Sequence, residues 1–199
     1  MMLMNYALLK NKKMDTRTMI PSDNSIKTNW YVVTGGPSTG KTTVINLLNK
    51  RGYQTAIEHA RHYIDTQKSK GKTVEEIREN KKKFQLGVLD MQIEQEHSLS
   101  PKDIVFLDRA IPDALAYYQF LELDYDKKLI EAMNNVSYKK IFILDRLPLV
   151  NDYARTEDKT AQEKIHALIT KVYESLPFPV LHVPVLNPEE RVDFILKNL

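Results

Sequence analysis

Cysteine is absent from the 199-residue sequence. Without thiols the chain forms neither disulfides nor thiolate metal sites, so its composition gives no indication of an oxidising compartment. Long apolar runs are absent as well, since no stretch approaches the roughly 18 residues that a membrane-spanning helix needs. With 28% charged and 42% hydrophobic residues, the composition is typical of one globular domain with a sizeable core. We therefore expect a soluble, cytoplasmic protein without a transmembrane segment.

An excess of positive or negative charge is absent outside the N-terminal region, because cations and anions balance there. The chain has a formal net charge of +3, and residues 1–30 alone carry five cations and two anions, which is the same balance. The remainder is neutral overall, which argues against a broad nucleic-acid interface. In the opening stretch the cations follow the apolar residues and no small-residue cleavage site succeeds them, which argues against a signal peptide. We expect residues 1–29 to form a basic, flexible or loosely docked tail, and residues 30–199 to form the folded domain.

From Trp30 onward, short β-rich runs alternate with longer helical patterns, which predicts a parallel sheet covered by crossover helices. The five predicted strands begin at Tyr31, Tyr53, Asp103, Lys140 and Phe178. Between the second and third strands, apolar residues recur at helical spacing and predict one amphipathic helix over residues 74–99. Those residues are Val74, Ile77, Phe84, Val88 and Met91. The three lysines at 81–83 are expected on its solvated face.

Glycine is scarce too, with six residues in all, yet three of them lie in the segment that follows the first predicted strand. The stretch GGPSTGKT, from Gly35 to Thr42, fits the Walker A spacing G-x-x-x-x-G-K-[ST] residue for residue. Glycines let successive backbone amides point inward around phosphate oxygens, and the helix that follows adds its N-terminal dipole. Lys41 is expected to reach the β- and γ-phosphates, and the Thr42 hydroxyl to ligate magnesium. The alternative, a glycine-rich turn that binds nothing, does not explain the flanking strand and helix. The predicted nucleotide-binding residues are Gly35, Gly36, Pro37, Ser38, Thr39, Gly40, Lys41, Thr42 and Thr43.

A second group for Mg-nucleotide follows the third predicted strand. Asp108 comes directly after four apolar residues, in the form of a Walker B motif, and is predicted to ligate magnesium together with Thr42. A strand-end aspartate that caps the next turn is the alternative. Arg109 follows at once, and its planar guanidinium is suited to the charge of a transferring phosphate.

With these residues the sequence resembles P-loop kinases, and among them the AAA-type ATP-binding family that includes the kinase domain of bacterial nicotinamide-nucleotide enzymes and some eukaryotic GTP-binding relatives. The matching stretches are TGGPSTGKTT, EHAR, FLDRAIPDALAY, NDYARTED and VPVLNPEERVDFIL, which together span roughly Trp30 to Leu199. The resemblance implies an α/β P-loop NTPase domain. It would be a three-layer sandwich with a five-stranded parallel sheet of order 2-3-1-4-5, helices on both faces and a lid after the fourth strand. Ala110 departs from the pattern, because a glycine is expected after the Asp-Arg pair.

The resemblance also assigns roles beyond the two motifs. Glu58 falls where the acceptor sits and could accept the proton of its hydroxyl, or it could be an ordinary helix N-terminal glutamate. Arg61 could contact substrate or lie in solvent. Asp113 could bind an acceptor hydroxyl or cap the helix that begins after Pro112. Arg155 is expected in the lid, closing over the phosphates.

The lid segment contains a second arginine, Arg146, and the chain has five histidines. Arg146, also in the lid segment, could instead pair with Asp145 or Asp152. The five histidines show no metal-binding motif, and we expect structural or solvated roles for them.

The resulting hypothesis is a phosphotransferase that uses Mg-ATP, with GTP possible as donor, and a small hydroxyl-bearing acceptor such as a nucleoside or a ribosyl pyridine. The predicted catalytic residues are Lys41, Asp108, Arg109, Glu58 and Arg155. The alternative is a nucleotide-controlled regulatory module with weak hydrolysis and a protein or lipid partner. A P-loop that binds nucleotide without catalysis is a third possibility. The guanine-reading motif N-K-x-D is absent, which argues against a standard GTPase.

Overall fold

A computed structural model describes residue 21 and residues 26–147 and 159–199 of the chain. Five strands form one parallel sheet in the order β2-β3-β1-β4-β5, as predicted. The strands are β1 Trp30–Thr34, β2 Gln54–Thr55, β3 Val105–Asp108, β4 Lys140–Leu144 and β5 Val180–Val183. Their carboxyl ends meet at one edge, where ligands bind in open α/β sheets.

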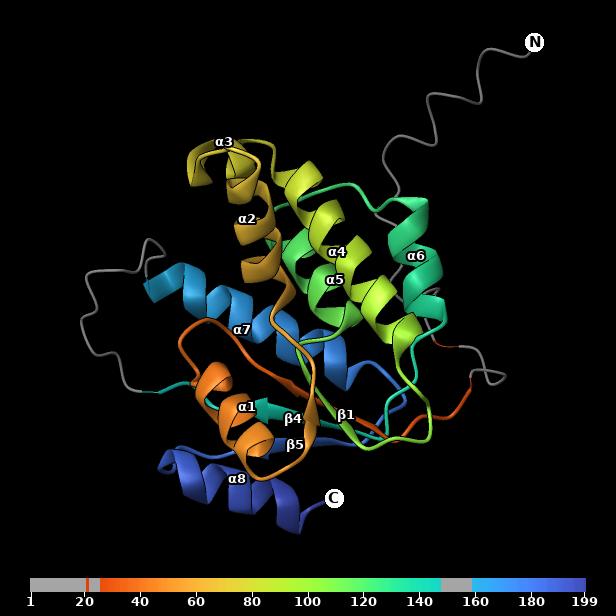
Figure 1. The fold of residues 1–199 in the computed structure, drawn as a ribbon, viewed down its shortest axis with the longest axis vertical. Coiled ribbons are helices and arrows are strands. Elements are labelled where there is room, and N and C mark those ends of the chain that lie inside the picture. Colours follow the sequence, from red (N-terminus) through yellow and green to blue (C-terminus); the bar gives the residue numbers. More distant parts are fainter. Residues whose placement is uncertain (1–20, 22–25, 148–158) are drawn as a thin grey trace.

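Helices cover both faces of this sheet and complete three layers (Figure 1). Within the described ranges they are α1 Lys41–Lys50, α2 His59–Ser69, α3 Val74–Glu79, α4 Lys81–Ser98, α5 Ile111–Phe120, α6 Lys127–Asn134, α7 Lys159–Glu174 and α8 Pro188–Lys197. No helix in the described ranges has both the length and the apolar composition needed to cross a bilayer.

Two hydrophobic cores follow from the alternation of side chains along the central strands. Val32 of β1 faces the core formed with α4, α5, α6 and α7, whereas its neighbours Tyr31 and Val33 face the core formed with α1 and α8. Because the central strands β1, β3 and β4 are buried on both faces, they appear in the sequence as continuous apolar runs rather than as alternating patterns. This burial explains why these three strands are predicted, whereas the edge strands β2 and β5 are more exposed.

The prediction of a single helix over residues 74–99 is wrong. The chain breaks at Asn80, which has φ −94° and ψ 88°, and its side chain accepts a hydrogen bond from Lys83 N at 2.9 Å. Asn80 therefore ends α3 and caps the start of α4. The buried face of α4 also differs from the predicted one, since it consists of Gln85, Leu89, Gln92 and Glu96.

The N-terminal tail lies mostly outside the described residues and stays a prediction. At its predicted end, Thr28 Oγ1 donates to Ser137 O at 2.6 Å and Asn29 N donates to Pro101 O at 2.8 Å. Hydrogen bonding to the domain thus begins before the first strand.

Candidate active site at the carboxyl edge of the sheet

The Walker A loop connects β1 to α1, as its sequence predicts. Gly35 has φ +139°, and a Cβ at this position would lie 2.8 Å from the backbone oxygen of Leu144. At Gly36 a Cβ would lie 2.7 Å from Cβ of His166 on α7, whose Nδ1 accepts a hydrogen bond from Gly36 N at 3.1 Å. Only glycine permits these two approaches, so the loop packs tightly against β4 and α7.

Lys41 lies at the start of α1 with 8% of its surface exposed. Its Nζ donates to Gly36 O at 2.8 Å. Burial lowers the pKa of this ammonium and Arg109 lowers it further, while the carboxylates of Asp108, Asp113 and Glu58 oppose both effects. A triphosphate in the loop would stabilise the charged form of Lys41, which is the chemistry that Walker A requires.

Asp108 ends β3 beside Val33 of β1, and only 3% of its surface is exposed. Burial raises the pKa of its carboxyl group, and its Oδ1 has no hydrogen-bond partner among the described residues. A buried carboxylate oxygen without a partner is the donor that a divalent cation would satisfy. Thr42, the other predicted magnesium ligand, lines the main cleft of the domain. The described residues contain no group of three or more His, Cys, Asp or Glu side chains that could hold a metal ion.

Arg109 and Asp113 form a buried ion pair at the start of α5. Arg109 adopts φ +67°, and its Nη1 lies 2.8 Å from Asp113 Oδ1. Its guanidinium also stands 5.4 Å from the ring centre of Tyr117. Ala110 has an extended backbone, φ −146° and ψ 178°, so the missing glycine is not needed at that position. The left-handed residue of this turn is Arg109 itself.

Asp113 caps α5, which is one of the two roles considered for it. Its Oδ2 accepts from Ala110 N at 3.1 Å and from the Tyr173 hydroxyl at 2.6 Å. Its Oδ1 accepts from Thr34 Oγ1 at 2.7 Å and from Arg109. Two bonds to each oxygen use the capacity of a carboxylate, so no lone pair is left for an acceptor hydroxyl.

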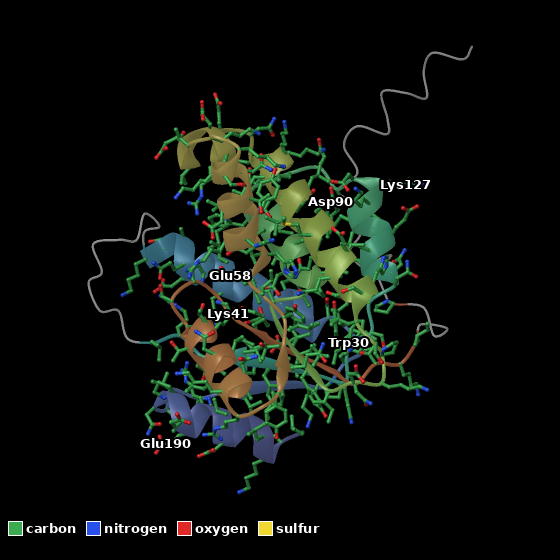
Figure 2. All side chains as sticks on the ribbon, in the orientation of Figure 1. Trp30, Lys41, Glu58, Asp90, Lys127 and Glu190 are labelled. Carbon is green, nitrogen blue, oxygen red and sulfur yellow. The ribbon has the colours of Figure 1, made fainter. Side chains whose placement is uncertain are left out.

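Glu58 stands at the N-cap position of α2 but makes no side-chain capping bond. Its nearest cation is Arg61, with Oε2 and Nε 3.8 Å apart, and both residues line the main cleft. Figure 2 shows Glu58 and Lys41 at the same edge of the sheet. The structure therefore brings Lys41, Asp108, Arg109 and Glu58 into one electrostatic neighbourhood.

A cleft of about 640 Å³ runs from the Walker A loop to the helices α2, α4 and α5. Ligand pockets for small molecules have this size. Its far wall is aromatic and polar, and consists of His59, Phe84, Gln85, Val88, Gln92, Tyr117 and Phe120. The sequence analysis did not identify these residues as a site.

The chain is similar to known proteins of the same fold. A family model described as an AAA domain matches residues 30–191. The chain belongs to the AAA domain family. No curated protein matches this AAA domain protein significantly.

Solved structures with the same fold are P-loop kinases. A deoxyadenosine kinase from M. mycoides with dCMP and a flexible dCDP aligns with 17% identity and a TM-score of 0.58, over 85% of this chain and 97% of that chain. A thymidylate kinase from Ehrlichia chaffeensis aligns with 17% identity and a TM-score of 0.56, over 87% and 99%. The NadR protein in complex with NR aligns with 18% identity and a TM-score of 0.56, over 85% of this chain and 50% of that chain. The family match and these structural similarities confirm that the chain resembles P-loop kinases in fold, and the observed sheet confirms the predicted strand order.

Two predictions for the lid region have different outcomes. Arg155 lies in residues 148–158, outside the described residues, and its role stays a prediction. Arg146 makes no ion pair with Asp145 in the structure, and Asp152 lies outside the described residues, so that pairing stays a prediction. Arg146 Nη1 instead lies 2.9 Å from Glu163 Oε1 on α7. The sequence does not predict the pair of Arg146 and Glu163, because α7 lies against the end of β4 only in the folded domain.

His59, for which a structural or solvated role was expected, lies at the wall of the cleft. It is 5% exposed, and neither ring nitrogen has a hydrogen-bond partner among the described residues. Burial, together with a smaller effect of His62, lowers the pKa of its imidazole to about 4, and Gln95 partly opposes this shift. The ring is therefore neutral at pH 7 and offers one donor and one acceptor.

Proposed function

We propose that this protein is a kinase that transfers the γ-phosphate of Mg-ATP to a hydroxyl group of a small metabolite, of the nucleoside or ribosyl-pyridine type. One observation carries the proposal. A single cleft contains the Walker A loop at one end, Glu58 beside it, and a partly aromatic wall with buried amide side chains at the other end. Donor and acceptor would thus meet in one enclosed space, which positioning catalysis requires.

At the donor end, the loop amides and Lys41 would hold the triphosphate. Thr42 and Asp108 would hold magnesium, which neutralises charge on the phosphates when bound. Arg109, fixed by Asp113 and Tyr117, directs a permanent charge into the cleft toward the transferring group. Arg155 is proposed to complete this set from the lid.

At the acceptor end, Glu58 would accept the hydroxyl proton or orient the hydroxyl group. Arg61, which lies beside it, is available to the same substrate. The wall opposite is suited to a flat, polar ring, because aromatic faces stack on planar groups and amides recognise their edges.

The amides of this wall are Gln85 and Gln92, two turns apart on α4 and buried. Each lines the cleft, where its amide is open to a ligand or to water. An amide group offers one acceptor oxygen and two N–H donors to such a ligand. A nucleobase or pyridine carboxamide carries the donors and acceptors that these side chains and His59 would meet. The deoxyadenosine kinase of the same fold was solved with dCMP and with dATP bound, which supports this choice of acceptor class.

The test is a screen for phosphorylated products by mass spectrometry. Nucleosides, ribosyl pyridines and small sugars are incubated with the protein, magnesium and either ATP or GTP, beside a reaction without acceptor. We expect ATP-dependent phosphorylation of one acceptor class by the wild type and none by Lys41→Ala. Nucleotide hydrolysis that is unchanged by every acceptor would contradict the kinase proposal and favour the regulatory module.

A further inference from the structure

Arg191 of α8 is a buried arginine that neither nucleotide motif includes. Only 2% of its surface is exposed. Its Nη1 donates to Thr39 O in the Walker A loop at 2.5 Å, its Nη2 to Asp145 O at 3.0 Å, and its Nε to Pro184 O at 3.0 Å. One guanidinium thus joins the nucleotide loop to the segments that follow β4 and β5.

Within the described part of the chain, the charge of Arg191 has no direct counter-ion. Among the described residues, no carboxylate lies within ion-pair distance of its guanidinium, although Asp145 is close enough to influence it. Burying a charge that is bonded only to carbonyl groups costs free energy, so a role for the three bonds is expected. Arginine suits such a role, because no other side chain has a rigid fork of donors that reaches three carbonyls at once.

The bond to Thr39 fixes the orientation of a phosphate-binding amide. Thr39 and Gly40 are joined by a trans peptide, in which the C=O and N–H groups point in opposite directions. Since Thr39 O is directed toward Arg191, the N–H of Gly40 is directed away from Arg191 and from α8. The positive guanidinium also polarises this peptide and strengthens the N–H as a donor to an anion.

We propose that Arg191 is a positioning residue that holds the Thr39–Gly40 peptide in its phosphate-binding orientation. The inference rests on the nucleotide binding in the proposed function, but not on the identity of the acceptor. It assigns to the C-terminal helix a role in the donor site, 152 residues away from the loop in sequence.

The docking of α8 itself does not depend on Arg191 alone. Val192 and Ile195 are buried in the core beside α1. Arg51, at the end of α1, lies 2.5 Å from Glu189 and 2.5 Å from Asp193 of α8. A substitution at Arg51 therefore perturbs the same helix interface without touching the loop, and supplies the matched control.

The experiment compares Mg-ATP affinity, measured by calorimetry without acceptor, in wild type, Arg191→Met, Arg191→Lys and Arg51→Met. We expect Arg191→Met to weaken binding by at least about tenfold, the usual effect of losing a charge-assisted hydrogen bond. Lysine should restore little of the affinity, because one ammonium group does not reach all three carbonyls. Arg51→Met should bind within about twofold of wild type. Binding within twofold in folded Arg191→Met, or an equal loss in Arg51→Met, would overturn the proposal.

A measurement on the wild type decides the case if the Arg191 variants do not fold. In a titration with Mg-ATP followed by nuclear magnetic resonance, the Nε–H signal of Arg191 and the amide signal of Gly40 should shift together. An Arg191 signal that stays constant while Gly40 shifts would contradict the coupling. A wild type that binds Mg-ATP but phosphorylates no acceptor would refute the proposed function and leave the role of Arg191 standing.

Discussion

Asp113→Asn should destabilise the protein more than any exchange of an exposed carboxylate. Asparagine keeps the size of the side chain but removes its charge and turns one acceptor oxygen into a donor. Whichever way the amide is oriented, its NH2 group faces either Ala110 N–H or the guanidinium of Arg109. At least one buried donor therefore loses its acceptor.

The size of the loss in the free energy of unfolding follows from the burial of Arg109 and Asp113. The side chains of Arg109 and Asp113 are 13% and 4% exposed, so water screens their interaction little. An unsatisfied buried donor costs about 1–3 kcal/mol. Loss of one partner of a buried ion pair costs about 3–5 kcal/mol. Because the two effects overlap at Asp113, we expect a loss of about 3 kcal/mol in the free energy of unfolding.

Urea unfolding at pH 7, followed by circular dichroism, measures this loss. Asp90→Asn is the matched control, since Asp90 pairs with Lys128 at 2.6 Å with side chains 51% and 53% exposed. An exposed pair of this kind contributes at most about 1 kcal/mol. Equal losses in the two variants would refute the argument that Asp113 holds Arg109 through buried bonds.

Four further predictions test the site and its surroundings. Lys41→Ala should weaken Mg-ATP binding by at least about tenfold in calorimetry, and equal affinity in a folded variant would remove Walker A from nucleotide binding. Asp108→Asn should lower magnesium-dependent turnover far more than nucleotide affinity, whereas unchanged turnover at saturating magnesium would make Asp108 a structural strand end. Arg155→Ala should lower turnover by about 10²-fold with little change in ATP affinity, and Arg155→Lys should rescue poorly; wild-type rates in both would exclude a lid role. Burial raises the pKa of Glu96 to about 8, so the folded protein retains a proton that the unfolded chain releases near pH 4.5. The free energy of unfolding should therefore fall as the pH rises from 4.5 to 8, by up to about 1.4 kcal/mol per pH unit. Glu96→Gln should flatten this slope in urea unfolding, and an unchanged slope would contradict the raised pKa of Glu96.

The sequence predicts those parts of the fold that depend on residues close together in the chain. Strands buried on both faces appear as short apolar runs, and the Walker A loop appears as a fixed spacing of glycines around Lys41. Each signal lies within a few residues. Topology then follows from the resemblance to P-loop kinases, and the observed sheet order agrees with it.

The parts that sequence did not predict depend on distant neighbours. Gln85 and Gln92 resemble surface residues of a helix, and they are buried only because α4 packs against α2 and α5. Glu96 is buried for a similar reason, as it accepts hydrogen bonds from Ile111 N and the Tyr138 hydroxyl. Arg191 is unremarkable in sequence until the fold brings it to the loop. The break at Asn80 is the exception, since an asparagine before a helical run is a local capping signal.

The two ends of the cleft differ in how much of their chemistry depends on side chains. The proposed donor end is built largely from backbone amides, whose orientation the fold imposes, and so proteins of this fold can share it at low sequence identity. The proposed acceptor end consists of side chains from α2, α4 and α5, which can change without disturbing the sheet. At 17–18% identity to the deoxyadenosine kinase, the thymidylate kinase and NadR, the similarity shows the fold, so the particular substrates of those proteins are not assigned to this chain. Under the proposed function, the acceptor is instead to be inferred from the side chains of Gln85, Gln92 and His59, which line the cleft and offer hydrogen-bond donors and acceptors to a bound ring.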